Sequence, residues 1–97
     1  MNKIITENTN YWHLTGELSF ATVGKLLTEL TSKITTLEAK ELTIDLKEVT
    51  KADSAGLALL IELLKLDVSI TFCNIPTRIL KLSSVAGIEE LLINKGI

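Results

Sequence analysis

Asp53 and Ser54 are the residues of this sequence best placed for chemistry, because they stand directly before a long apolar segment, residues 55–65. Either side-chain oxygen can accept a hydrogen bond from the free amide groups in the first turn of a helix. The same position places a hydroxyl group at the positive end of the helix dipole, where an added phosphate is tolerated. Ala55 and Gly56 add little bulk beside it, so a kinase or a partner backbone could approach Ser54 closely. Two interpretations therefore stay open, a helix cap and a regulated contact point.

The apolar segment behind Ser54 carries more hydrophobic surface than a helix needs to pack on one core. Its leucine and isoleucine side chains cover roughly 200° of a helical wheel drawn at about 100° per residue, whereas a stripe of about 100° is enough for one face. Glu62 and Lys65 are its only charged residues. Either the helix is buried on two sides within the domain, or part of this surface contacts another protein, and we expect the second.

Composition predicts one folded domain over residues 1–97 and excludes several classes of function. The chain is 46% hydrophobic and 23% charged, and its net charge is −2. Since no basic stripe is present, nucleic acid is not an expected partner. No stretch reaches the about 18 consecutive apolar residues of a membrane span, and the N-terminus lacks the apolar core of a secretory signal. We therefore expect a cytoplasmic protein without direct membrane insertion.

The residues that usually carry catalysis are not arranged for it. The sequence has no catalytic-triad spacing, no glycine-rich phosphate loop and no cluster of metal ligands, so we expect no enzymatic activity, cofactor or metal. Its single cysteine, Cys73, cannot form an internal disulfide, and we expect it to be a small buried side chain. The single histidine, His13, is interpreted as an ordinary strand residue.

The periodicity of the chain predicts an α/β fold with the element order β-β-α-β-α-β-α. β-branched and aromatic residues at 3–6 and 11–18 indicate an N-terminal hairpin. Residues 41–46 and 68–73 are expected to be further strands, and 47–51 a polar connection. Because helices separate the later strands, some of the strand pairing must be parallel. One small mixed β-sheet flanked by helices is the simplest arrangement.

Three helices are expected, at 20–37, at 54–65 and after Pro76. Ser19 is the expected N-cap of the first helix, and Pro76 suits the first turn of the third. The third helix is expected to end at Gly87 and to turn three side chains inward, those of Ile79, Leu82 and Val85. The sequence "IEELLIN" is ambiguous between a short strand and a helical turn.

The stretch "VTKADSAGLALLIELL" resembles the hallmark of STAS domains, in which Asp and then Ser or Thr are followed by a small residue, Gly and Leu. The segments "LTGELSFATVGKLLTEL", "ELTIDLKEV" and "VSITFCNIPTRILKLSSVAGIEELL" resemble other strands and helices of the same family. The resemblance covers nearly the whole chain. It implies a STAS-like α/β domain and a regulatory protein that is not an enzyme.

Two branches of this family fit a chain of this length. The continuation Gly-Leu-Ala-Leu-Leu and the lone Trp12 are similar to the small STAS subunit of the Mla phospholipid-transport system of Gram-negative bacteria. That resemblance implies an accessory subunit that binds and supports the cytoplasmic ATPase of an ABC transporter at the inner membrane. Anti-sigma factor antagonists are the more distant alternative, and they imply an anti-sigma kinase as partner and phosphorylation of Ser54. The connection "KLD" after Leu64 is shorter than in most STAS domains.

Both branches imply the same contact surface, at the start of the second long helix and the neighbouring turn. Ser54 is expected to bury its hydroxyl against the partner. Arg78, the only arginine, is expected either to pair with a partner carboxylate or to remain solvated. The expected partner-binding residues are Asp53, Ser54, Ala55, Gly56, Leu57, Asn74, Pro76 and Arg78.

Overall fold

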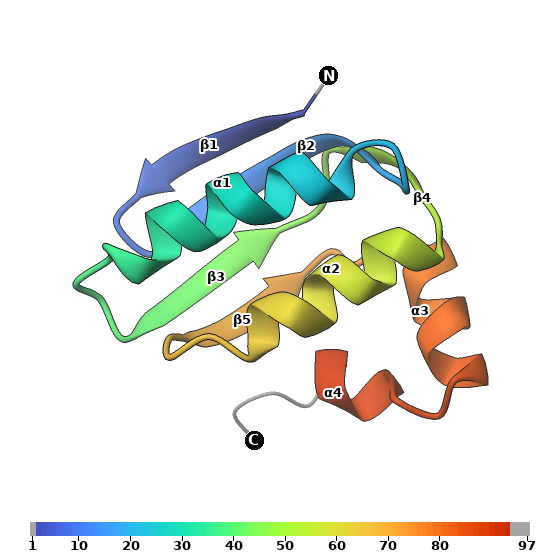
Figure 1. Cartoon of the computed structure of the whole chain (residues 1–97). Helices are drawn as coiled ribbons and strands as arrows, with labels where there is room; N and C mark the ends of the chain where they lie inside the picture. Colours follow the sequence, from blue (N-terminus) through green and yellow to red (C-terminus); the bar gives the residue numbers. More distant parts are fainter. Residues whose placement is uncertain (1, 94–97) are drawn as a thin grey trace.

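The structure, a computed structural model, describes residues 2–93 of the chain. Its elements follow in the order β1 (Lys3–Asn8), β2 (Tyr11–Leu18), α1 (Val23–Thr35), β3 (Glu41–Asp45), β4 (Val49–Ala52), α2 (Ser54–Leu64), β5 (Ser69–Cys73), α3 (Thr77–Val85) and α4 (Glu89–Ile93), as Figure 1 shows. The predicted α/β fold with a mixed sheet is confirmed. Two elements go beyond the predicted order, the strand β4 and the helix α4.

The strand β2 organises the sheet because three other strands pair with it. It pairs antiparallel with β1 in the expected hairpin. Its first half, Tyr11–His13, pairs in parallel with Thr43–Asp45 of β3, and its second half pairs in parallel with β4. The sheet is completed by β5, which pairs in parallel with β3. The segment predicted as a polar connection, residues 47–51, therefore holds most of β4, since the second half of β2 would otherwise have no neighbour on that side.

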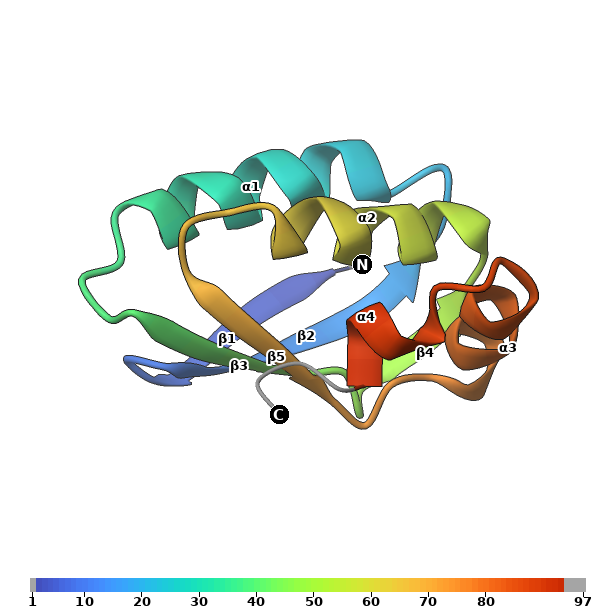
Figure 2. The same ribbon diagram turned by 90° about the horizontal axis from the view of Figure 1, so that it is seen from below.

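The helices α1 and α2 lie on one face of the sheet, and α3 and α4 lie beside α2 (Figure 2). Alternate residues of the strands point toward the helices and form the core with the apolar stripe of α1. The fully buried members from α1 and the strands include Leu14, Leu30, Ile34, Leu42, Ile44 and Ile70.

The helix α2 is buried on more than one side within the chain, so the prediction of a surplus apolar face is wrong. It contacts α1 and α3 as well as β4, β5 and α4. Its large apolar residues are all buried or half-buried, namely Leu57, Leu59, Leu60, Ile61, Leu63 and Leu64. The sequence left α4 ambiguous, and it is this helix that adds Leu92 to the core beside α2.

Two details of the helix ends also differ from the prediction. The first helix begins at Val23, later than expected, and Ser19 is not its N-cap. Instead, the Ser19 carbonyl accepts hydrogen bonds from the amides of Thr22 and Val23 at 2.9 Å each, so Phe20 lies in a turn outside the helix. In α3, Ile79 is buried as expected, but the Val85 side chain is 89% exposed because it lies in the last position of the helix.

Candidate functional site

Asp53 joins the start of α2 to the loop that follows β2. One carboxylate oxygen accepts a hydrogen bond from the Ala55 amide at 2.8 Å, which caps the helix. The other accepts a hydrogen bond from the Phe20 amide at 3.3 Å. Partial burial opposes ionisation of Asp53, but these amides, that of Gly56 and the charge of Arg78 outweigh it and lower the pKa of the carboxyl group. Asp53 is therefore a stable anion that holds two segments together.

Gly56 lets α2 approach the end of β2 more closely than any other residue would allow. A Cβ atom at this position would lie 2.7 Å from the Leu18 carbonyl oxygen and 3.0 Å from the Leu18 Cβ. The same carbonyl accepts a hydrogen bond from the Asp53 amide at 3.1 Å, so it cannot swing away freely. Gly56 and Leu57 are both buried. They set the position of the helix end and are not themselves available to a partner.

Ser54 is exposed at the first turn of α2. Within residues 2–93 no hydrogen bond engages its hydroxyl group, because the cap is made by Asp53. Ala58, one turn further along the helix, is also exposed. Two small side chains therefore form a stripe along which another backbone can approach α2 closely.

Phe20 is the feature of this region that the sequence did not reveal. Its side chain is 88% exposed, although its amide is held by Asp53. The sequence predicted a helix over residues 20–37 that began at Phe20. No pattern in the sequence opposed that assignment, since Phe20 precedes Val23 by three residues and Leu27 by seven, which is helical spacing.

The helix α3 brings positive charge to the same end of the molecule. Pro76 lies at its N-cap position, one residue before the helix, and Arg78 and Lys81 are both exposed on it. The charge of Arg78 contributes to the lowered pKa of Asp53, which places the two residues within electrostatic range. The start of α2, the Phe20 turn and α3 thus gather at one end of the structure (Figure 1). We call Phe20, Asp53, Ser54, Ala58 and Arg78 the tip surface.

Asn74 belongs to a different group of side chains, around the buried carboxylate of Asp45. Its backbone adopts the left-handed conformation, with φ 54°, and its side-chain amide donates to Asp45 at 2.9 Å. The Tyr11 hydroxyl and the Lys47 amide also donate to Asp45, at 2.8 and 2.9 Å. Burial opposes ionisation, but these hydrogen bonds and the nearby His13 lower the pKa of the Asp45 carboxyl group. The Asn74 side chain therefore stabilises the turn before α3.

The remaining members of this cluster are Cys73, His13 and Glu7. The Cys73 sulfur lies 3.5 Å from the Tyr11 hydroxyl, and the thiol is half-buried, so the expectation of a buried cysteine is met only in part. Hydrogen bonds to Cys73 and then to Asp45 raise the pKa of Tyr11 above its ordinary value. His13 contacts Glu7 at 2.6 Å. The cluster ties β1, β2, β3 and the turn after β5 together.

Comparison with known proteins identifies the fold family. A family model described as "Mlab, STAS domain" matches residues 3–94. The chain belongs to this STAS family. A search of curated proteins finds no match. Among solved structures, the STAS domain is similar to the anti-sigma factor antagonist SpoIIAA in its unphosphorylated form, with a TM-score of 0.71 and 12% identity over 96% of this chain and 86% of that chain.

A second solved structure, described as Mglu, matches part of a longer protein. The similarity has a TM-score of 0.57 and 25% identity, and it covers 78% of the STAS domain but only 20% of the other chain. The two structural matches agree on the fold. The family hallmark, "DSAGL", coincides with the start of α2. Its first four positions have distinct physical roles: Asp53 caps the helix, Ser54 exposes a hydroxyl group, Ala55 adds little bulk beside it, and Gly56 allows close approach to Leu18.

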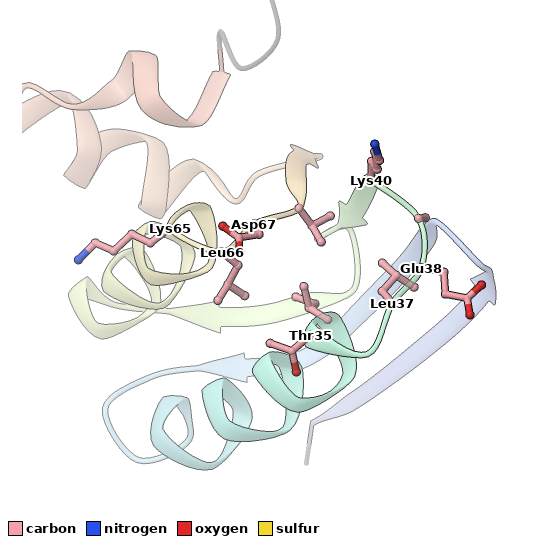
Figure 3. A pocket seen from close by; sticks show the side chains of 10 residues that line it. Thr35, Leu37, Glu38, Lys40, Lys65, Leu66 and Asp67 are labelled. Atoms are coloured by element: carbon pink, nitrogen blue, oxygen red, sulfur yellow. The ribbon is translucent and has the colours of Figure 1, made fainter.

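The STAS domain also has a shallow hollow at the other end of α2 (Figure 3). It measures about 420 Å³ and is lined by residues around the end of α1 and the connection from α2 to β5, including Leu37 and Leu66. The charged ends of Glu38, Lys40 and Lys65 extend outward from it. Its lining is partly polar, with Thr35 and Asp67 beside the apolar side chains, and it includes no residue of the tip surface.

Two further features bear on the class of function. Among residues 2–93, no group of three or more His, Cys, Asp and Glu side chains is arranged to hold a metal ion. None of the helices in that part of the chain is both long enough and apolar enough to span a bilayer.

Proposed function

We propose that this STAS domain is a non-enzymatic accessory subunit that binds the cytoplasmic ATPase of an ABC-type phospholipid transporter and favours its assembled, active state. The family match over residues 3–94 supports this proposal, because the family is described as Mlab-type. The observation that carries it is the exposed start of α2, where Ser54 and Ala58 present a small, accessible stripe.

In this mechanism the STAS domain acts by docking and touches neither nucleotide nor lipid. Ser54 and Ala55 meet the partner backbone, and Arg78 pairs with a partner carboxylate. Asp53 keeps the start of α2 and the Phe20 turn in one arrangement through its two amide contacts. The remaining residues of the expected surface act indirectly: Gly56 and Leu57 position α2, while Asn74 and Pro76 position α3.

Co-purification of the native STAS domain with its cellular partners tests the proposal. We expect recovery of an ABC ATPase with its permease, and a higher ATPase rate when the domain is present. Ser54→Glu is expected to weaken binding, since an added charge at the contact must be desolvated. Ser32→Glu is the matched control, because Ser32 is exposed on α1 far from the tip surface. Recovery of an anti-sigma kinase in place of the ATPase would contradict the proposal.

The second candidate function is an anti-sigma factor antagonist controlled by phosphorylation of Ser54. The exposed Ser54 hydroxyl at a helix N-terminus favours it, since a phosphate there would be both accessible and stabilised by the helix dipole. The solved structure with the higher TM-score of the two described above is an anti-sigma factor antagonist, although at 12% identity it supports the fold alone. Intact mass of the native protein distinguishes the candidates: a population one phosphate heavier, absent from Ser54→Ala, would favour the antagonist.

A further inference from the structure

We infer that Phe20 is the anchor of the interface and inserts into an apolar pocket of the ATPase that is bordered by acidic side chains. This inference rests on the proposed function and specifies the chemistry of the partner's site. It makes the turn between β2 and α1, and not only the start of α2, part of the contact surface.

The exposure of Phe20 is the first observation behind this inference. Its side chain is 88% exposed, and it is the one exposed aromatic side chain among residues 2–93. Leaving a phenylalanine in water forgoes about 1.5–3 kcal/mol that burial would contribute. The packing of the domain does not require an aromatic ring here, since Phe20 is not part of the core. Aromatic residues are also enriched among those that contribute most to protein–protein binding.

The second observation is that the backbone under Phe20 is fixed by hydrogen bonds on both sides. Its own amide donates to Asp53 at 3.3 Å. The preceding Ser19 amide donates to the Thr22 hydroxyl at 2.9 Å, and the Thr22 hydroxyl donates to the Glu17 carbonyl at 2.8 Å. A ring on such a turn loses little conformational freedom on binding, which favours its use as an anchor.

The third observation is the positive charge of α3, which lies at the same end of the molecule as the Phe20 turn. The exposed residues of α3 include Arg78 and Lys81, and the helix contains no carboxylate. Within residues 2–93 no salt bridge engages Arg78, and both oxygens of Asp53 are turned toward backbone amides. The exposed face of α3 is therefore cationic although the whole chain carries −2, whereas the carboxylates nearest Phe20 are those of Asp53 and Glu17, which are engaged in hydrogen bonds. Complementarity of charge then predicts acidic residues on the part of the partner's rim that faces α3.

The fourth observation is the pair of small exposed residues on α2. The helix α2 lies between α1 and α3 (Figure 1), and Ser54 and Ala58 are exposed on it one turn apart. A partner surface that receives the aromatic ring and pairs with Arg78 would cross this low stripe without a steric obstacle.

The inference is tested by measuring the affinity of the purified ATPase for variants of the STAS domain by isothermal titration calorimetry. Phe20→Ala is expected to weaken binding by about tenfold or more, and Phe20→Leu by less. Ile5→Ala is the matched control, since Ile5 is a 47%-exposed apolar residue on β1, away from the tip surface, and it is expected to bind like the wild type. Thermal unfolding of each variant checks that the domain remains folded.

The charge of the pocket is tested with Arg78→Ala over a series of salt concentrations. The wild-type affinity is expected to fall with salt, and that of the variant to fall less steeply. If the wild type binds and Phe20→Ala binds equally well, the anchor is refuted while the proposed function stands. If affinity is independent of salt, the acidic rim is refuted. If the wild type does not bind the ATPase at all, the proposed function itself fails.

Discussion

Replacing Gly56 by alanine is expected to destabilise the domain, against the usual effect of this substitution in a helix. Glycine in a helix interior normally disfavours folding by about 1 kcal/mol relative to alanine. Here the new methyl group would lie 2.7 Å from the Leu18 carbonyl oxygen, and overpacking of this kind costs about 1–3 kcal/mol. Because the obstacle is backbone and not a flexible side chain, we take the upper end of that range.

The carbonyl that the new methyl group would displace also has a hydrogen bond to lose. It accepts from the Asp53 amide at 3.1 Å, and weakening that bond costs about 1 kcal/mol, which cancels the gain in helix propensity. The expected net loss is therefore about 2–3 kcal/mol. For a domain of this size that corresponds to a fall of roughly 10–20 °C in Tm.

Urea unfolding followed by far-UV circular dichroism measures this loss, and Gly24→Ala is its matched control. Gly24 also lies in the first turn of a helix, but a Cβ atom there would meet nothing within 4 Å. Alanine at this position is expected to leave the stability unchanged or to raise it by up to about 1 kcal/mol. If both variants unfold at the same urea concentration with equal slopes, then close approach of α2 to Leu18 does not restrict position 56.

Three other perturbations test further contacts. Asp53→Ala removes the acceptor for the amides of Ala55 and Phe20 and should lower the free energy of unfolding by about 0.5–2 kcal/mol in urea; an unchanged value would show that the cap contributes nothing. Leu57→Asp should abolish the far-UV signal of the isolated domain, because Leu57 is 8% exposed; a folded variant would place this side of α2 in solvent. The folded-state pKa of Asp45 lies below its ordinary value of 3.8, so its contribution is present above that pH and is lost as the pH falls through the lower, folded value. Asp45→Asn should be less stable at neutral pH and lose less stability on acidification, and identical acid titrations of the two proteins would exclude this role.

Local patterns in the sequence were enough to predict much of the fold. The alternation in β2 and the apolar stripe of α1 each correspond to an observed element, although α1 begins three residues later than predicted. The strand β4 was missed because it is only four residues long and two of them, Thr50 and Lys51, are polar and exposed, so nothing in the pattern distinguishes a short edge strand from a loop. Its pairing depends on β2, which lies more than 30 residues earlier in the chain.

The parts of the site that could not be predicted are those that depend on contacts between distant segments. The motif located the start of α2, and the cap by Asp53 is the alternative that was left open at that position. The bond from Phe20 to Asp53, however, spans 33 residues, and the bond from Tyr11 to Asp45 spans 34. The prediction of a surplus apolar face on α2 was wrong for the same reason. A helical wheel counts apolar side chains but does not count the neighbours that cover them.

The division of β2 between two parallel partners has a consequence for the rate and the heat of association. The strands β2 and β4 end side by side at Leu18 and Ala52. The Phe20 turn after β2 and the start of α2 after β4 are therefore held next to each other, and the bond from Phe20 to Asp53 joins them. A second protein would thus meet a surface already in its final shape, and no segment would have to fold on arrival. Encounter should then follow simple one-step kinetics, and the change in heat capacity should match the apolar area of a rigid contact alone.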